Sequence, residues 1–216
     1  APVSIISTNN KEIYMLTIAL PKGRIAEETL EKFEKAFNEK FVFEDRKLIL
    51  EKAGFTFLNV RNQDVPTYVM HGAADLGVVG LDVLAEKEYD LIKLLDLNLG
   101  KCKVAIGLKA GTQLDWTKSE IKVATKHVNI AKGFFEKKAM AVDIVKLYGS
   151  IELAPLVGLS DCIVDIVETG ATMKQNGLEV GDTIMETSAH LIANKNSFYI
   201  KKEEILNIKE KIQEVL

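Results

Sequence analysis

The sequence predicts an α/β protein of two lobes with a ligand site between them. Strand-like and helix-like hydrophobic periods alternate along its 216 residues, which is typical of this class. A polar break at residues 109–112 and a return at 181–185 indicate that the chain crosses from one lobe to a second and back. Ligand sites in such proteins favour the carboxyl ends of strands, where loops gather. We expect lobe I over residues 1–108 and 184–216, and lobe II over residues 109–183.

In the first lobe, short apolar runs predict strands, and apolar residues that recur every three or four positions predict helices. The expected strands are 15–20, 47–50, 55–60, 76–79 and 103–108, and the expected helices are 25–38, 65–71 and 81–89. The two kinds of period alternate along this part of the chain, and this alternation carries the α/β assignment.

The second lobe begins after Gly111 and a polar stretch that ends at Glu120. The same periods predict strands at 121–124, 144–147 and 163–167, and helices at 130–138 and 151–159, the latter rich in small residues. After Gly181 and Asp182 a strand over 183–193 ends at Asn194, and a charged amphipathic helix over 203–216 follows.

Composition excludes several classes of protein. With 47% hydrophobic residues the chain can bury a core. A net charge of -3 and the lack of a basic stripe argue against nucleic-acid binding. Both cysteines, Cys102 and Cys162, lie in apolar runs, which favours buried thiols in a reducing compartment and gives no metal-ligand spacing.

The chain shows no membrane signal. No apolar run is as long as a membrane span, and residues 1–14 lack the basic and apolar regions of a signal peptide. We therefore expect a cytoplasmic protein that does not bind a membrane. Residues 1–14 are polar at 7–12 and are interpreted as a partly ordered extension.

The loop that follows the apolar run 163–167 has the features of a phosphate site. Thr169 and Thr172 would lie at a helix N-terminus, where unpaired N–H groups and the helix dipole favour an anion. Gly170 allows close approach of the backbone, and the acids Asp165 and Glu168 can accept hydrogen bonds from sugar hydroxyls. These residues suggest a sugar phosphate as ligand. The alternative is a strand-turn-helix in which the threonines only cap the helix.

Arginine is scarce in this chain. Of 28 basic residues only Arg24, Arg46 and Arg61 are arginines, which leaves 25 lysines. Arginine is suited to bidentate phosphate recognition, and lysine does not replace it at such a site. All three lie in the first third of the chain, each near a strand-like run. We expect phosphate contacts for Arg24 and Arg46 above all; structural salt bridges are the alternative.

Several separated motifs, together with this loop, resemble the ATP phosphoribosyltransferase family over roughly residues 15–200. They are Leu20-Pro-Lys-Gly-Arg24, Asp64-Val-Pro66, Gly72-Ala-Ala-Asp75-Leu-Gly77-Val-Val-Gly80 with Asp82-Val-Leu84, and Leu147-Tyr-Gly-Ser150 with Glu152-Leu-Ala-Pro155. The resemblance implies an enzyme that condenses ATP with phosphoribosyl pyrophosphate, with Mg²⁺, in the first step of histidine biosynthesis. It also implies a two-lobed fold like that of the periplasmic binding proteins, with the active site in the cleft between lobes.

The chain resembles the short form of the family, because it stops where long members continue into a histidine-binding regulatory domain. Short members work in a hetero-oligomer with a regulatory subunit that resembles histidyl-tRNA synthetase. Two positions depart from the family pattern: Lys103 stands where arginine is frequent, and His127-Val128 where Tyr-Pro is usual. These departures put the contacts at those positions in doubt and leave the loop unchanged.

The resemblance also implies roles for residues. N1 of adenine attacks the anomeric carbon as pyrophosphate leaves, so catalysis rests on positioning and electrostatics rather than on a protein nucleophile. Mg²⁺ would be held mainly by substrate phosphates, with no all-protein metal site. The implied donor-binding residues are Asp165, Glu168, Thr169, Gly170, Ala171 and Thr172; the implied catalytic residues are Arg24, Arg46 and Glu152; and Lys22, Arg61 and Asp82 would bind ATP or line the cleft.

Two other functions stay open at this point. A solute-binding module without catalysis would share the two-lobed fold, and a phosphoribosyltransferase with another acceptor would share the threonine loop. We assign no general-base role to His71, His127 or His190, because a histidine at a helix end is commonly a partner of the helix dipole.

Overall fold

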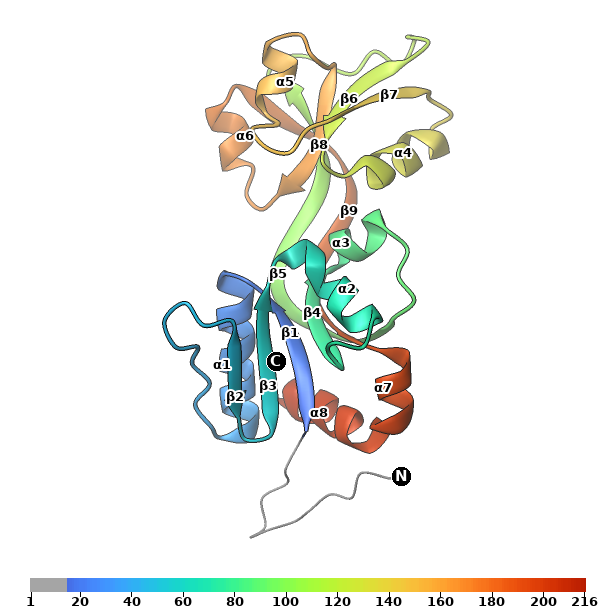
Figure 1. Cartoon of the computed structure of the whole chain (residues 1–216). Helices are drawn as coiled ribbons and strands as arrows, with labels where there is room; N and C mark the ends of the chain where they lie inside the picture. Colours follow the sequence, from blue (N-terminus) through green and yellow to red (C-terminus); the bar gives the residue numbers. More distant parts are fainter. Residues whose placement is uncertain (1–14) are drawn as a thin grey trace. The chain divides into compact units, whose positions relative to one another are not determined.

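The computed structural model describes residues 15–216; residues 1–14, where we expect an extension without a signal peptide, lie outside the described residues. Figure 1 shows strands and helices alternating along the chain, so the expected α/β class is confirmed. The chain divides into two compact units. Unit 1 contains the described residues up to Leu84 with Glu88–Gly100 and Ser188–Leu216, and unit 2 contains Ala85–Lys87 and Lys101–Thr187.

The boundaries of the units differ from the lobe boundaries that the sequence predicts. The chain changes unit after residues 100 and 187, rather than after residues 108 and 183. Two strands run through both units: β5 (Ile92–Lys109) and β9 (Leu178–Ala193). A strand that continues across a boundary shows no change of hydrophobic period there, and the polar break at 109–112 marks only the end of β5.

Unit 1 contains a mixed sheet and several helices. The strands that lie wholly within it are β1 (Leu16–Pro21), β2 (Ile49–Lys52), β3 (Phe55–Val60) and β4 (Leu76–Gly80). The helices are α1 (Arg24–Phe37), the 3-10 turn η1 (Asn62–Asp64), α2 (Val65–Met70), α3 (Leu81–Glu86), α7 (Lys195–Ile200) and α8 (Lys202–Glu214). β1 pairs in parallel with β3 and β4, whereas β2 and β9 join antiparallel. The carboxyl ends of β1, β3 and β4 therefore share one edge of this sheet.

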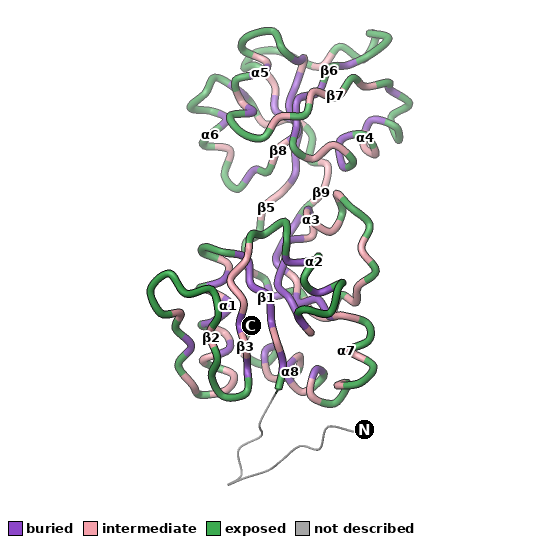
Figure 2. The backbone as a smooth tube through the Cα atoms, in the orientation of Figure 1, coloured by how far each residue is buried: buried purple, intermediate pink, exposed green. Residues whose placement is uncertain are grey.

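The core of unit 1 is centred on phenylalanine side chains. Phe33 on α1 is 1% exposed, and its ring centroid lies 5.6 Å from that of Phe55 and 5.3 Å from that of Phe57, both edge-on. Aromatic pairs of this geometry contribute roughly 0.5–1.5 kcal/mol beyond the burial of their area. Helix α8 adds buried side chains to the same core: Ile205, Ile208 and Ile212. Figure 2 shows the buried positions concentrated on the strands, and every residue of β4 is buried.

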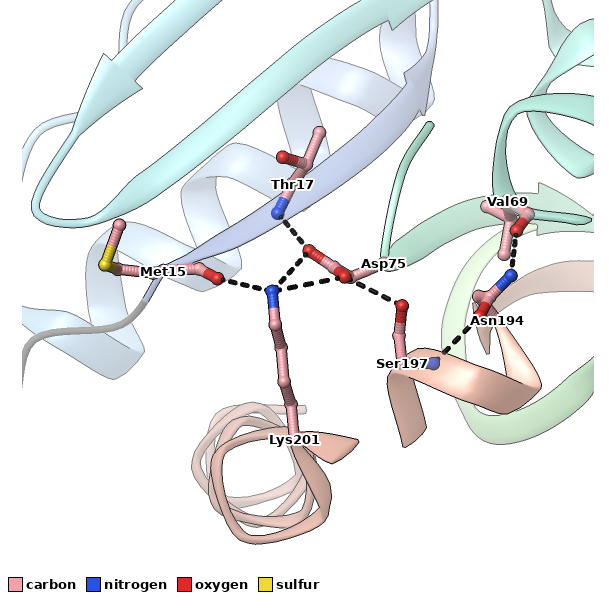
Figure 3. Close-up of polar contacts among 7 residues, drawn as sticks. All are labelled: Met15, Thr17, Val69, Asp75, Asn194, Ser197 and Lys201. Atoms are coloured by element: carbon pink, nitrogen blue, oxygen red, sulfur yellow. Dashed lines mark hydrogen bonds and ion pairs between the residues drawn. The ribbon is translucent and has the colours of Figure 1, made fainter. Parts of the chain in front are cut away.

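A polar cluster ties the start of β1 to β4 and the last two helices (Figure 3). The Asp75 carboxylate accepts hydrogen bonds from the Thr17 backbone N–H at 2.9 Å and from Ser197 Oγ at 2.8 Å. Lys201 Nζ lies 3.3 Å from Asp75 Oδ1 and donates to the Met15 carbonyl at 3.0 Å. Asp75 lies in the motif Gly72–Gly80 that the sequence analysis singles out, and these contacts give it a structural role.

We expect Asp75→Ala to lower the free energy of unfolding by about 1.5–3 kcal/mol, the range for hydrogen bonds to a charged group. The reason is that the Thr17 N–H and the Lys201 ammonium would lose a half-buried partner. Urea denaturation followed by circular dichroism measures the change. Asp90→Ala is the matched control, because Asp90 pairs with Lys195 on the exposed surface, where a pair is worth at most about 1 kcal/mol. Equal effects of the two variants would contradict the role of Asp75.

Unit 2 contains a second group of parallel strands. Its elements are β6 (Ile121–Thr125), α4 (Val128–Lys137), β7 (Val142–Lys146), α5 (Leu153–Leu156), β8 (Cys162–Val167) and α6 (Ala171–Gln175), together with half of β5 and most of β9. β6 pairs in parallel with β7 and β8, and β8 pairs antiparallel with β5. The complete strand order is β2-β3-β1-β4-β9-β5-β8-β6-β7. In unit 2 the carboxyl ends of β7, β6 and β8 thus lie at one edge.

A glycine on β5 makes room for the helix that follows the threonine loop. A Cβ atom added at Gly107 would lie 2.7 Å from Ile163 Cγ1 on β8 and 3.0 Å from the sulfur of Met173 on α6. Both neighbours are buried. Only glycine therefore allows Met173 to anchor α6 over this part of the sheet, and α6 in turn fixes the loop.

The segment Ala85–Lys87 belongs to unit 2 because Glu86 caps helix α4. Its carboxylate accepts hydrogen bonds from the backbone N–H groups of Asn129 at 2.8 Å and Ile130 at 3.0 Å. An acidic side chain satisfies otherwise unpaired N–H groups at a helix start and complements the helix dipole. The start of α4 thus already has an anionic partner within the protein.

The prediction that both cysteine thiols are buried is right for one of them. Cys162 is buried, and burial raises the pKa of its thiol to about 12; Cys102 is half-buried. Among residues 15–216, no helix combines the length and the apolar character needed to cross a membrane.

Candidate functional site

The carboxyl ends of the parallel strands in unit 2 gather the residues that the sequence predicts for sugar-phosphate binding. The register pairs Thr125 on β6 with Val164 on β8, so Asp165 lies one position beyond this pair. The chain then leaves β8 through Glu168 and Thr169 into α6. This edge is where loops can hold a ligand in α/β proteins.

The threonine loop forms a turn that leads into α6. Thr169 Oγ1 accepts a hydrogen bond from the Ala171 N–H at 3.3 Å, and Ala171 and Thr172 are exposed in the first turn of the helix. The expected strand-loop-helix arrangement is confirmed. The N-cap residue of α6 is Gly170, which supplies no side-chain cap, and the bond made by Thr169 closes the turn just before it.

Gly170 is required by the turn itself. It has a φ of 83°, in the left-handed region that favours glycine. A Cβ atom at this position would also lie 3.2 Å from Val180 Cγ2. A bulky substitution at Gly170 would therefore disturb the loop even without a ligand, and variants of Asp165 or Thr172 test ligand binding more cleanly.

Asp165 is a half-buried carboxyl group with a perturbed acidity. Burial raises its pKa, the Glu152 charge raises it further, and the Ile166 N–H, His127 and Lys126 act in the opposite direction. A carboxyl whose pKa is shifted by burial and by a neighbouring charge is a functional-site signal. Because the ionised form is the better acceptor for sugar hydroxyls, ligand affinity should fall as pH decreases through this raised pKa.

Glu152 lies immediately before α5, which is a single turn over Leu153–Leu156. The sequence predicts a longer helix over 151–159. Pro155 is tolerated only in a first turn, and Gly158, at a φ of 76°, lies outside the helix. The structure brings Glu152 close enough to Asp165 for their charges to interact, although they are 13 positions apart in the chain.

Unit 1 gathers the remaining predicted residues at its own sheet edge. Lys22 follows β1, and its N–H donates to the Val60 carbonyl at the end of β3 at 2.7 Å. Arg24 begins α1, and Arg61 follows β3. Arg46 precedes β2, whose start is held beside the end of β3 by a bond from the Asn59 N–H to the Leu48 carbonyl. The basic residues thus share the edge that carries the carboxyl ends of β1 and β3.

Arg24 forms a salt bridge, which is the alternative to a phosphate contact that the sequence leaves open for the arginines. Its Nε lies 2.8 Å from Glu28 Oε1, one turn along α1, and the Arg24 side chain is 77% exposed. An exposed pair of this kind contributes at most about 1 kcal/mol. It does not prevent the guanidinium from binding a phosphate.

Arg46 and Asp82 differ in their surroundings. Arg46 is exposed in a turn and has a φ of 57°. Asp82 in the first turn of α3 is 5% exposed, which favours a structural role over direct contact with a ligand. Within residues 15–216, no three His, Cys, Asp or Glu side chains gather where they could hold a metal ion.

Thr125 and His127 also belong to the unit 2 edge, and neither is among the residues that the sequence predicts for the site. His127 Nε2 lies 4.0 Å from Asp165 Oδ1. The signal for them is positional: they end the strand next to β8, and parallel strands deliver their following residues to the same edge.

Known proteins resemble this chain over nearly its whole length. The sequence profile of the family described as ATP phosphoribosyltransferase matches residues 61–214. A protein of that name from Sulfurovum sp. is 70% identical over 202 residues, which cover 94% of this chain and 98% of the relative. One from Wolinella succinogenes is 65% identical over 201 residues, which cover 93% and 98%.

Solved structures agree with the fold. The chain is similar to one chain of the ATP phosphoribosyl transferase (HisG:HisZ) complex from Thermotoga maritima, with a TM-score of 0.82, 38% identity, and coverage of 93% of this chain and 98% of that one. The substrate-binding protein of an amino acid ABC transporter has a TM-score of 0.56 at 10% identity, and the match covers 92% of each chain. The second likeness concerns the fold alone.

Proposed function

The chain belongs to the ATP phosphoribosyltransferase family, a family of transferases that act in the first step of histidine biosynthesis, and from that premise we propose how its residues perform the reaction. The chain transfers the phosphoribosyl group of phosphoribosyl pyrophosphate to N1 of ATP and releases pyrophosphate. The observation that carries this proposal is the juxtaposition of a half-buried carboxylate and a threonine loop at one sheet edge of unit 2.

We propose that the loop binds the 5′-phosphate of the donor. The start of α6, where Ala171 and Thr172 are exposed, and the hydroxyl groups of Thr169 and Thr172 are suited to a phosphate. Asp165 then accepts hydrogen bonds from the ribose hydroxyls, and exposed Glu168 supports it.

Arg24 and Arg46 are proposed to bind the pyrophosphate group, where bidentate contacts offset the charge that develops as it leaves. Mg²⁺ is expected to arrive bound to the substrate phosphates, since it retains several waters and needs few protein ligands. When bound, the ion would supply further charge neutralisation at the leaving group.

The reaction needs no protein nucleophile. N1 of adenine attacks the anomeric carbon while the bond to pyrophosphate breaks, so the transition state has oxocarbenium character. Asp165 and Glu152 place negative charge near the ribose, which favours such a state. Lys22 and Arg61 are proposed to serve ATP binding, and the buried Asp82 is proposed to support that site structurally.

We further propose that the chain works in the cytoplasm within a hetero-oligomer. The similar Thermotoga maritima chain comes from a HisG:HisZ complex, and a partner resembling histidyl-tRNA synthetase would serve this chain in the same way. Its role would be regulatory, with the chemistry carried by the chain described here.

An assay with ATP, phosphoribosyl pyrophosphate and Mg²⁺ tests the proposal. We expect phosphoribosyl-ATP, detected by mass spectrometry, to form slowly or not at all with the isolated chain and quickly after the partner subunit is added. Reactions without the donor serve as controls. If neither preparation forms the adduct, the transferase assignment is wrong for this chain; if the isolated chain is fully active and unaffected by the partner, the partner proposal is wrong.

A further inference from the structure

A threonine hydroxyl fixes the backbone of His127 beside β8. Thr125 Oγ1 donates to the Val164 carbonyl at 2.6 Å and accepts from the His127 N–H at 2.8 Å. Thr125 is fully buried. One hydroxyl therefore links the end of β6 to the β8 residue immediately before Asp165. It also fixes the backbone from which the His127 side chain extends.

The His127 ring carries a polar atom without a partner. Its Nε2 is buried and makes no hydrogen bond among the described residues. The nearest acidic atom is Asp165 Oδ1, at 4.0 Å, and the two side chains are only 13% and 18% exposed. Leaving a buried polar nitrogen unpaired is costly. At 4.0 Å the pair is too far apart for a hydrogen bond, yet close enough for a small side-chain movement to form one.

We propose that His127 is a positioning residue for Asp165: when the sugar donor binds, His127 Nε2–H closes on the carboxylate and holds it oriented toward the ribose hydroxyls. The proposal rests on the donor-binding role proposed above for Asp165.

The groups around Asp165 are consistent with this role. Glu152, from the start of α5, opposes ionisation of the carboxyl, and Lys126 and His127, from the end of β6, favour it. On its other side β5 places Ala105, which carries no charge, opposite Asp165. Burial and Glu152 both raise the pKa of Asp165, and His127 and Lys126 act against that rise. Of these, His127 is the one whose ring nitrogen is buried beside it.

The first experiment tests the pairing of His127 with Asp165 without any substrate. The chemical shift of the Asp165 carboxyl carbon is followed by NMR as a function of pH. His127→Gln should raise the pKa of Asp165 by about one pH unit, because a cation within a few ångströms favours the ionised carboxyl. His127→Phe, which keeps the ring and removes its nitrogens, should act in the same direction. Thr125→Val should give a smaller rise, since only the backbone anchor is lost. His71→Gln, at an exposed helix end, is the matched control and should leave the titration unchanged.

The second measurement is donor binding by calorimetry across pH. At acid pH the affinity for phosphoribosyl pyrophosphate should fall as Asp165 becomes protonated. In His127→Gln this fall should occur at a higher pH, together with the Asp165 titration, and a rise of about one pH unit in the pKa weakens binding about tenfold in that acid range. A merely structural role would lower affinity equally at every pH. An Asp165 titration that is identical in wild type, His127→Gln and His127→Phe would overturn the proposal. If wild type itself does not bind the donor, the proposed function fails while the NMR result still decides whether the two residues are paired.

Discussion

Replacing Asp165 with asparagine should weaken phosphoribosyl pyrophosphate binding by roughly 10- to 150-fold, the effect of losing one hydrogen bond of about 1.5–3 kcal/mol to a charged group. An amide of the same shape accepts from the sugar hydroxyls without the charge. Calorimetry on the purified chain measures the loss. Because Asp165 is proposed to contact the ribose hydroxyls rather than the 5′-phosphate, the affinity for inorganic phosphate should change little.

The same variant should not be less stable than wild type. The pKa of Asp165 is raised in the folded state, so the folded chain binds this proton more tightly than the unfolded chain does. The ionised group therefore costs stability above the raised pKa, and stability improves as pH falls through it. We expect Asp165→Asn to equal or exceed the wild-type Tm at pH 7. Asp143→Asn, on the exposed side of β7, is the control for binding; a wild-type affinity in folded Asp165→Asn would reject the ribose-binding role.

Phe33→Ala should lower the free energy of unfolding by about 3–5 kcal/mol, the range for truncating a buried phenylalanine. Phe33 is 1% exposed and its ring contacts the rings of Phe55 and Phe57 at 5.3–5.6 Å. The cavity would be surrounded by other aromatic rings, two of which are held by strand β3, so it cannot easily collapse. Urea denaturation followed by circular dichroism gives the measurement.

Tyr199→Ala is the matched control in the same unit, because Tyr199 is 84% exposed and a surface truncation typically changes stability by at most about 0.5 kcal/mol. Trp116 is the one tryptophan in the sequence and lies in unit 2, so its fluorescence follows the unfolding of unit 2 separately. A loss below about 1 kcal/mol in Phe33→Ala would mean that the aromatic cluster is not the centre of the unit 1 core.

Much of the fold can be predicted from hydrophobic period, because most elements bury one face. Helix α1 is expected over 25–38 and found at Arg24–Phe37, and the strand expected over 55–60 is β3. Strand β5 is the main failure: 103–108 is expected, whereas the strand begins at Ile92. Its first half, residues 92–100, mixes Lys93, Asp96 and Asn98 with leucines and is divided mainly between half-buried and exposed positions. Pairing with neighbouring strands, rather than local pattern, defines that half.

Helix α7 could have been found from the sequence by its cap. Asn194, where a strand is expected to end, is its N-cap, and the Asn194 side chain accepts from the Ser197 N–H at 2.8 Å. Asparagine is among the preferred residues at that position. The following Lys195–Ile200 stretch leaves no residue buried, however, so its apolar period is weak and the cap is the only local signal.

The candidate site also contains residues that the local sequence predicts and residues that only strand pairing brings together. The threonine loop and Asp165 can be found from sequence, since a carboxylate, a glycine and hydroxyl groups stand together over a few residues. His127 cannot, because its relation to Asp165 depends on the parallel register of β6 and β8 and on the bridge made by Thr125. Residues that act through neighbours on other strands leave no contiguous pattern in the chain.

The antiparallel pairing of β4 with β9 has a consequence for how the protein is made. Leu76 pairs with Ala193, and α8 closes the unit 1 core with Ile205, Ile208 and Ile212. A ribosome therefore releases almost all of unit 2, which is nearly contiguous over Lys101–Thr187, before unit 1 can acquire its last strand and helix. Until then the edge of β4 that pairs with β9 has no partner strand and the core residues that α8 covers stay exposed, so unit 1 remains incomplete during most of synthesis.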